Sequence, residues 1–176
     1  DALAACAQDL TERLLADGPR VPEHHFLSAL VADRDGRKDD ARRAYLAAVA
    51  AAKGDYPEAF LNLGLLEKGA GDAAAARKAY RRAIALRPAY AAAWLNLGKL
   101  EESLGRAADA ERAWRKALEV DAKYAPALLS LGQLHSSQGR FDDAIADFRR
   151  ALELRPGYAA AELSLGVALA RAGRHG

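Results

Sequence analysis

One stretch of the chain decides its fold: AAAWLNLGKLEESLGR, residues 91 to 106. Three other stretches align with it, namely PEAFLNLGLLEKGAGD from Pro57, APALLSLGQLHSSQGR from Ala125 and AAAELSLGVALARAGR from Ala159. Consecutive copies begin 34 residues apart. A fixed period of this length indicates a repeat architecture, in which each unit packs on its neighbours.

Each repeat is predicted to form two helices. The first half carries apolar residues at helical spacing around a Leu-Gly pair, and the second half carries an Ala-x-x-x-aromatic-x-x-Ala pattern. A glycine separates the halves, at the point where a left-handed cap would reverse the chain. The recurring positions are Gly64, Gly98, Gly132 and Gly166; Tyr80, Trp114 and Phe148; and Gly36, Gly71, Gly105 and Gly139.

The glycine inside the first helix requires an explanation, because glycine there costs about 1 kcal/mol relative to alanine. We expect a second backbone to approach it closely, with Ala76, Ala110 and Ala144 of the following helices as the contacts. Trp94 and Trp114 fall on inward stripes and are predicted to lie in the core.

These residues resemble the tetratricopeptide repeat, whose pattern is met by Trp94, Leu97, Gly98, Ala110, Trp114 and Ala117. Two positions of this copy depart from the pattern, since Glu101 replaces a tyrosine and Ala122 replaces a proline. The resemblance implies an all-α fold, a right-handed superhelical solenoid of antiparallel helix pairs.

The chain is predicted to be a single domain of four whole repeats, 22–56, 57–90, 91–124 and 125–158, between two partial ones, 1–20 and 159–176. The last helix, residues 159–171, keeps Leu163 and Val167 and has no polar outer stripe, which a terminal repeat needs for solubility. We therefore expect either that the parent protein continues or that this end associates with another copy.

Composition excludes several classes of protein. The 26 Lys and Arg residues nearly balance 24 Asp and Glu, and the net charge of +2 gives no signal for nucleic acid. No apolar run approaches the roughly 20 residues that span a bilayer, so membrane insertion is not expected. A single cysteine, Cys6, forms no internal disulfide. We expect a cytoplasmic protein, with the periplasm left open, and the Ala and Arg content suggests a bacterial gene.

No catalytic, metal or cofactor site is predicted. His24 and His25 are adjacent and point to different helix faces, and His135 occupies a packing position of the repeat. The carboxylate pairs Glu101-Glu102 and Asp142-Asp143 are interpreted as exposed. Basic doublets recur at Arg81-Arg82, Arg115-Lys116 and Arg149-Arg150, and we interpret them as a solvated face with no nucleic-acid partner.

Asn96 lies beside the core stripe of its helix, and the same repeat position holds Asn62, Ser130 and Ser164. The resemblance implies that this position lines a concave groove where side-chain amides hold an extended peptide, as in the similar repeats of O-linked N-acetylglucosamine transferases. The predicted groove comprises Asn62, Leu65, Lys68, Asn96, Lys99, Glu102, Ser130, Gln133 and Ser164. The residues of the family's clamp for acidic C-terminal peptides are absent, so a neutral, partly apolar segment is expected.

The sequence thus predicts a non-catalytic scaffold that binds a protein or peptide partner. Two alternatives stay open. In one, the chain is the substrate-recognition arm of a larger enzyme, such as a glycosyltransferase. In the other, it is a self-assembling structural scaffold.

Overall fold

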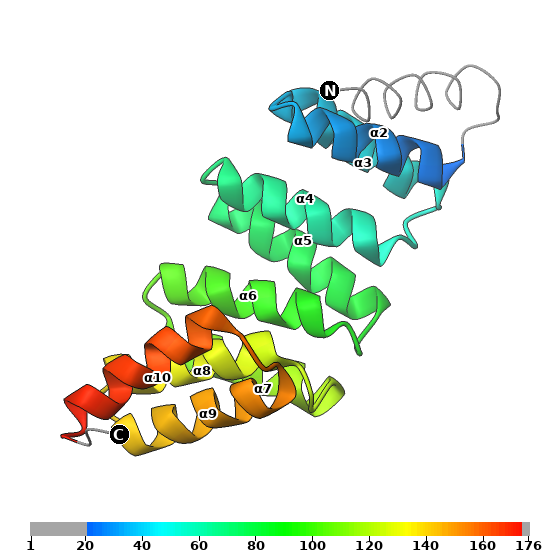
Figure 1. The fold of residues 1–176 in the computed structure, drawn as a ribbon. Coiled ribbons are helices and arrows are strands. Elements are labelled where there is room, and N and C mark those ends of the chain that lie inside the picture. The colour runs from blue at the N-terminus through cyan, green and yellow to red at the C-terminus, as the bar shows by residue number, and fades with distance from the viewer. Residues whose placement is uncertain (1–20, 174–176) are drawn as a thin grey trace. The chain divides into compact units, whose positions relative to one another are not determined.

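The computed structural model describes residues 21–173, which form helices joined by short turns, with no strand in this part of the chain (Figure 1). The helices are α2 (Pro22–Arg34), α3 (Lys38–Ala51), α4 (Pro57–Gly69), α5 (Ala73–Leu86), α6 (Ala91–Ser103), α7 (Ala107–Val120), α8 (Ala125–Ser137), α9 (Phe141–Leu154) and α10 (Ala159–Arg171). The predicted all-α helical repeat fold is confirmed. Cys6 and the partial repeat predicted over residues 1–20 lie outside the described residues.

The turns inside each helix pair have the predicted backbone conformation. Gly105, between α6 and α7, has a φ of 74°, and Gly36, Gly71 and Gly139 at the corresponding places have φ values of 77°, 84° and 76°. A side chain is strained in this left-handed region, whereas glycine adopts it at little cost. The second helix of each pair therefore reverses direction after a very short connection.

Contacts divide the chain into two compact units, one ending at Arg87 and the other beginning at Pro88. In the first unit, α2 packs against α3, α4 packs against α5, and α3 contacts α4. The second unit contains the α6–α7 and α8–α9 pairs, joined by contacts between α7 and α8, and α10 packs on α9. Each unit is built from alanine-rich faces around one buried aromatic ring per helix pair.

Those rings explain the glycines inside the first helices. A Cβ at Gly132 would lie 2.5 Å from a ring carbon of Phe148, and one at Gly64 would lie 2.5 Å from a ring carbon of Tyr80. A Cβ at Gly98 would likewise clash with the indole ring of Trp114. The predicted close approach is thus present, but the expected partner was wrong: the nearest atoms belong to the aromatic side chain and not to the alanine one turn earlier.

The two tryptophans differ in environment. Trp114 is completely buried, and its indole Nε1–H donates a hydrogen bond to the carbonyl oxygen of Leu95 over 3.1 Å. Trp94 is only partly buried, and its Nε1–H donates to the carbonyl oxygen of Pro88 over 2.9 Å. Trp114 is a core residue, as predicted, while Trp94 packs at the edge of the core and caps the loop before α6.

Candidate functional site

A groove lies between two first helices of the second unit, α8 and α10. It has a volume of about 280 Å³ and is lined by Gln133, Ser136, Ser137, Phe148, Leu163, Ser164, Val167 and Arg171. Two predicted site residues, Gln133 and Ser164, thus line one groove. Its walls combine hydroxyls and an amide with Leu163 and Val167, so they can satisfy a peptide backbone and also cover apolar side chains.

The other predicted residues of this unit lie on α6 and α8. Lys99 and Glu102 are exposed, and Asn96 is partly buried. The Asn96 Nδ2 group donates a hydrogen bond to the carbonyl oxygen of Ala92 over 2.8 Å, which leaves a second N–H and the amide oxygen for a partner. Ser130 is 5% exposed, so its hydroxyl lies beneath the surface and not on it.

The first unit holds the remaining three predicted residues, all on α4. The Asn62 Nδ2 group donates to the carbonyl oxygen of Glu58 over 2.9 Å, which repeats the arrangement of Asn96. Leu65 is exposed and Lys68 is partly exposed. Both asparagine amides thus bond first to their own helix, a local contact that the sequence analysis did not anticipate.

The outer face of α10 is apolar. Leu163 is 73% exposed and Val167 is 43% exposed, and the only buried residues of this helix are Ala161 and Ala168. The absence of a polar stripe on this helix, predicted from the sequence, therefore corresponds to exposed aliphatic side chains that also form one wall of the groove.

Two carboxylates lie in the core at equivalent positions of the first helices. Glu101 is 4% exposed and its Oε2 lies 3.1 Å from Nη1 of Arg106, so the interpretation of Glu101 as exposed was wrong. Glu67 is bound by Arg42 through two hydrogen bonds of 2.7 and 2.9 Å. These contacts with Glu67 raise the pKa of the Arg42 guanidinium. Each acid is buried but paired with an arginine whose side chain still reaches solvent, so neither carboxylate is left as an unpaired buried charge.

The third equivalent position holds His135, which is also buried. Its Nδ1 lies 2.8 Å from Oδ2 of Asp147 on α9, and its Nε2 lies 3.9 Å from Oε1 of Glu111 on α7. Burial raises the pKa of Asp147, while the neighbouring His135 opposes that rise. Sequence analysis assigned His135 to packing and missed its carboxylate neighbours, because they lie on two other helices.

The basic doublets differ from one repeat to the next. In α7, Arg115 pairs with Glu111 and Lys116 pairs with Glu119. On α5, by contrast, neither Arg81 nor Arg82 has a carboxylate partner within the described residues. Over the same residues, no group of three His, Cys, Asp or Glu side chains is arranged to hold a metal ion.

Comparison with protein families agrees with this geometry. Family models described as tetratricopeptide repeat match residues 5–59 and 89–157, and one described as TPR repeat matches residues 70–105. The chain is a tetratricopeptide repeat protein. The repeats seen in the sequence and the helix pairs seen in the structure are therefore those of this family.

Solved structures similar to this tetratricopeptide repeat protein include two of MamA. One, "Crystal structure of MamA protein", aligns with a TM-score of 0.72 and 25% identity over 86% of this chain and 82% of that one. The other, "Crystal structure of MamA", gives a TM-score of 0.70 and 27% identity over 81% of this chain and 82% of that one. No curated protein matches the sequence.

Family and fold together establish the general role of the chain as a protein-interaction scaffold. Tetratricopeptide repeat domains mediate binding to protein partners, through surfaces that stacked helix pairs leave open. Within residues 21–173, none of the helices has the length and apolar character needed to cross a bilayer.

Proposed function

We propose that this tetratricopeptide repeat protein binds an extended, partly apolar segment of a partner protein in the groove between α8 and α10. The observation that carries the proposal is the lining of that groove, where Gln133 and Ser164 stand beside Leu163 and Val167. Gln133 and Ser164 can hydrogen-bond a peptide backbone, and Leu163 and Val167 can bury alternate apolar side chains. We also propose that the chain comprises four whole repeats between two partial ones.

The predicted site residues of the other first helices are proposed to bind peptide as well. On α6 these are Asn96, Lys99 and Glu102, and on α4 they are Asn62, Leu65 and Lys68. Each asparagine keeps an amide oxygen and one N–H beyond the bond to its own helix. Ser130 is buried, so we expect no direct contact between its hydroxyl and the peptide.

Peptide-array binding tests the proposal. The Gln133→Ala/Arg171→Ala variant is expected to lose the peptides that the parent chain selects. Its control, Gln138→Ala/Arg149→Ala, makes the same chemical changes at exposed positions outside the groove lining. Circular dichroism checks that both variants fold. Equal loss in both variants, or none in either, would contradict the proposal.

The predicted asparagine contacts need a separate variant. Asn62→Ala/Asn96→Ala removes both amides while leaving the α8–α10 groove intact. We expect weaker peptide binding, by about threefold for each lost hydrogen bond. Unchanged binding would restrict the peptide site to the α8–α10 groove.

A second candidate function, self-association, is supported by the exposed Leu163 and Val167 of α10. We propose that this face contacts another copy at high protein concentration. Light scattering should then show a mass that rises with concentration and falls in the Leu163→Ser/Val167→Ser variant. A constant monomer mass in the parent chain would rule out this association.

A further inference from the structure

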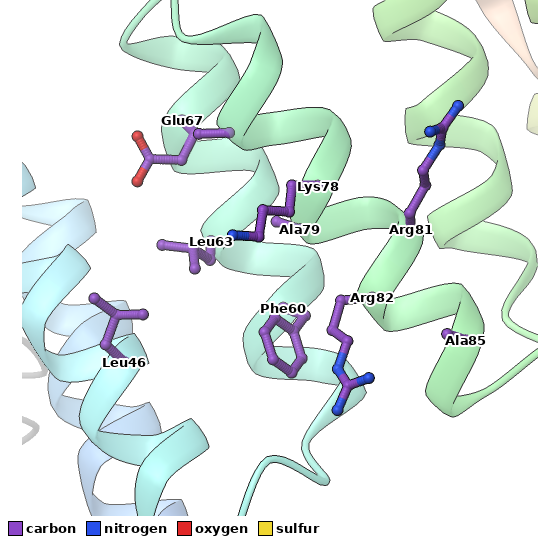
Figure 2. A pocket seen from close by; sticks show the side chains of 10 residues that line it. Leu46, Phe60, Leu63, Glu67, Lys78, Ala79, Arg81, Arg82 and Ala85 are labelled. Atoms are coloured by element: carbon purple, nitrogen blue, oxygen red, sulfur yellow. The ribbon is translucent and has the colours of Figure 1, made fainter.

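A larger pocket lies in the first unit, where α3 of one helix pair meets α4 and α5 of the next pair. Its volume is about 630 Å³, and α3, α4 and α5 contribute its lining. Figure 2 shows Leu46 of α3 facing Leu63 and Phe60 of α4 across this space. The pocket is separate from the proposed peptide groove, which is formed by residues of the second unit.

Leu46 makes this site differ from its counterparts. It follows the buried ring of Tyr45, and the residues that follow the equivalent rings in the later repeats are Arg81, Arg115 and Arg149. An aliphatic side chain, 49% exposed, thus stands where the other repeats carry a cation. Because of this exchange, one wall of the pocket is apolar and open to solvent.

Two cations border the apolar space. Figure 2 shows the Lys78 side chain directed towards Leu63 and the Arg82 guanidinium beside Phe60, whose ring centroid lies 5.9 Å from Arg82 Cζ. Neither cation has a carboxylate partner among the described residues, and the nearby Glu67 is held by Arg42. Lys78 and Arg82 are one helical turn apart, where like charges repel, so a bound anion would relieve an unfavourable contact.

We propose that this pocket docks an acidic segment of a partner protein that carries an apolar side chain. The apolar side chain inserts between Leu46, Phe60 and Leu63, and flanking carboxylates of the segment bind Lys78 and Arg82. Two cations on successive turns match two carboxylates spaced along a peptide better than the single carboxylate of a fatty acid. Charge complementarity therefore favours a protein segment over a lipid.

The probe for this proposal is a fluorescein-labelled, amide-capped helical peptide with Leu at i, i+3, i+4 and i+7 and Glu at most other positions. Fluorescence anisotropy with the full 176-residue chain is expected to show saturable binding that weakens as salt is added. A peptide with Lys in place of every Glu should not bind, and one with Ser in place of every Leu should bind more weakly.

Three variants locate the site. Lys78→Gln/Arg82→Gln is expected to weaken binding about tenfold, and Leu46→Ser about fivefold. The control Lys123→Gln/Arg149→Gln makes the same chemical changes and removes the same total charge at exposed positions that do not line the pocket. This control should change the affinity by less than about twofold. All four positions are exposed cations and Leu46 is half exposed, so the fold should be retained.

Several outcomes would overturn the proposal. One is an equal loss of binding in the test and control variants, since binding would then depend on net charge alone. Another is tighter binding of dodecanoate than of the peptide, measured by calorimetry and abolished by Leu46→Ser, which would assign the pocket to a lipid. A dimer of the parent chain that Leu46→Ser dissociates would assign it to a second copy.

Discussion

The two units follow the same repeat pattern, yet the side chains at equivalent positions differ in polarity. The buried ring of the helix pair is tyrosine in both pairs of the first unit, Tyr45 and Tyr80, whereas the second unit has Trp114 and Phe148. All four rings are at most 1% exposed. A buried aromatic ring is thus maintained at this position, while the number of buried hydroxyls is not.

The two units also differ in the polarity of the side chains around α4 and α8. In the first unit, the position of Glu67 adjoins an open apolar pocket. In the second unit, the equivalent position holds His135, and Asp147 stands where the first unit has Ala79. His135 and Asp147 occupy this place, and Leu128, the counterpart of Phe60, is 1% exposed. A few polar substitutions on a common backbone thus decide whether this place is open or filled.

The largest predicted difference between the units appears at high pH. Burial raises the pKa of both Tyr45 and Tyr80 to about 12, above the ordinary value of 10.0. Because the folded state retains these protons more tightly, the stability they confer is complete below pH 10 and is lost as the pH rises through 12. Ionisation of each tyrosine should lower the free energy of unfolding of the first unit by about 2 kcal/mol near pH 12.

The two tryptophans, both in the second unit, make this prediction measurable. Urea unfolding near pH 12 followed by tryptophan fluorescence reports the second unit, while circular dichroism reports both. We expect the dichroism transition to begin at lower urea, and to move towards the fluorescence transition in Tyr45→Phe/Tyr80→Phe. A smaller loss is expected in the second unit, since burial also raises the pKa of Tyr124. Coincident transitions in the parent chain would contradict the prediction.

The next effect tests what the units share, the contact between glycine and ring. Gly132→Ala places a methyl group against Phe148 and should destabilise the second unit by about 2 kcal/mol. Gly166 is the matched control, because a Cβ there meets no described atom within 4 Å. Gly166→Ala should stabilise α10 by up to about 1 kcal/mol through helix propensity. Thermal unfolding that shifts in the same direction for both variants would refute this explanation of the glycines.

A smaller effect is expected for the tyrosine hydroxyls at neutral pH. The Oη atoms of Tyr45 and Tyr80 are buried without a hydrogen-bond partner among the described residues. Removing an unsatisfied buried hydroxyl relieves its desolvation cost, so Tyr80→Phe should raise the free energy of unfolding by about 1 kcal/mol. Urea unfolding at pH 7 measures this change. A clear loss of stability would instead show that the hydroxyl has a partner, such as a bound water molecule.

The smallest effect on stability is expected from Leu46→Arg, which gives the first repeat the residue that the later repeats carry. Leu46 is half exposed, so the free energy of unfolding should change by less than about 0.5 kcal/mol. Thermal unfolding checks this value. A loss of more than about 2 kcal/mol would mean that Leu46 supports the core and does not simply border a pocket.

The sequence was sufficient for the helices and turns because these depend on local spacing. The 34-residue period places Gly105 and its counterparts in left-handed turns, and it puts Gly132 one helix away from an aromatic ring. The period does not show which atoms of the next helix face Gly132. For this reason Ala144 was expected there in place of the Phe148 ring. That choice requires the relative rotation of two helices, which single-helix periodicity does not contain.

Contacts across helices account for the rest of what the sequence did not predict. The Arg42–Glu67 pair joins residues 25 positions apart, and His135 meets carboxylates from two other helices. One signal was nevertheless present in the sequence: Leu46 interrupts the basic doublets at a position where arginine is otherwise regular. An exception to a repeat indicates a local difference more clearly than a conserved repeat position does.

The contact between glycine and ring also has a mechanical consequence. Since the glycine contributes no side chain, the ring alone acts as the spacer between the two helices of a pair, and its size sets the gap. Tyr80, Trp114 and Phe148 are spacers of different size and shape in successive pairs. A tetratricopeptide array of this kind can therefore have its helix spacing adjusted one pair at a time, by exchanging a single ring and leaving every surface residue unchanged.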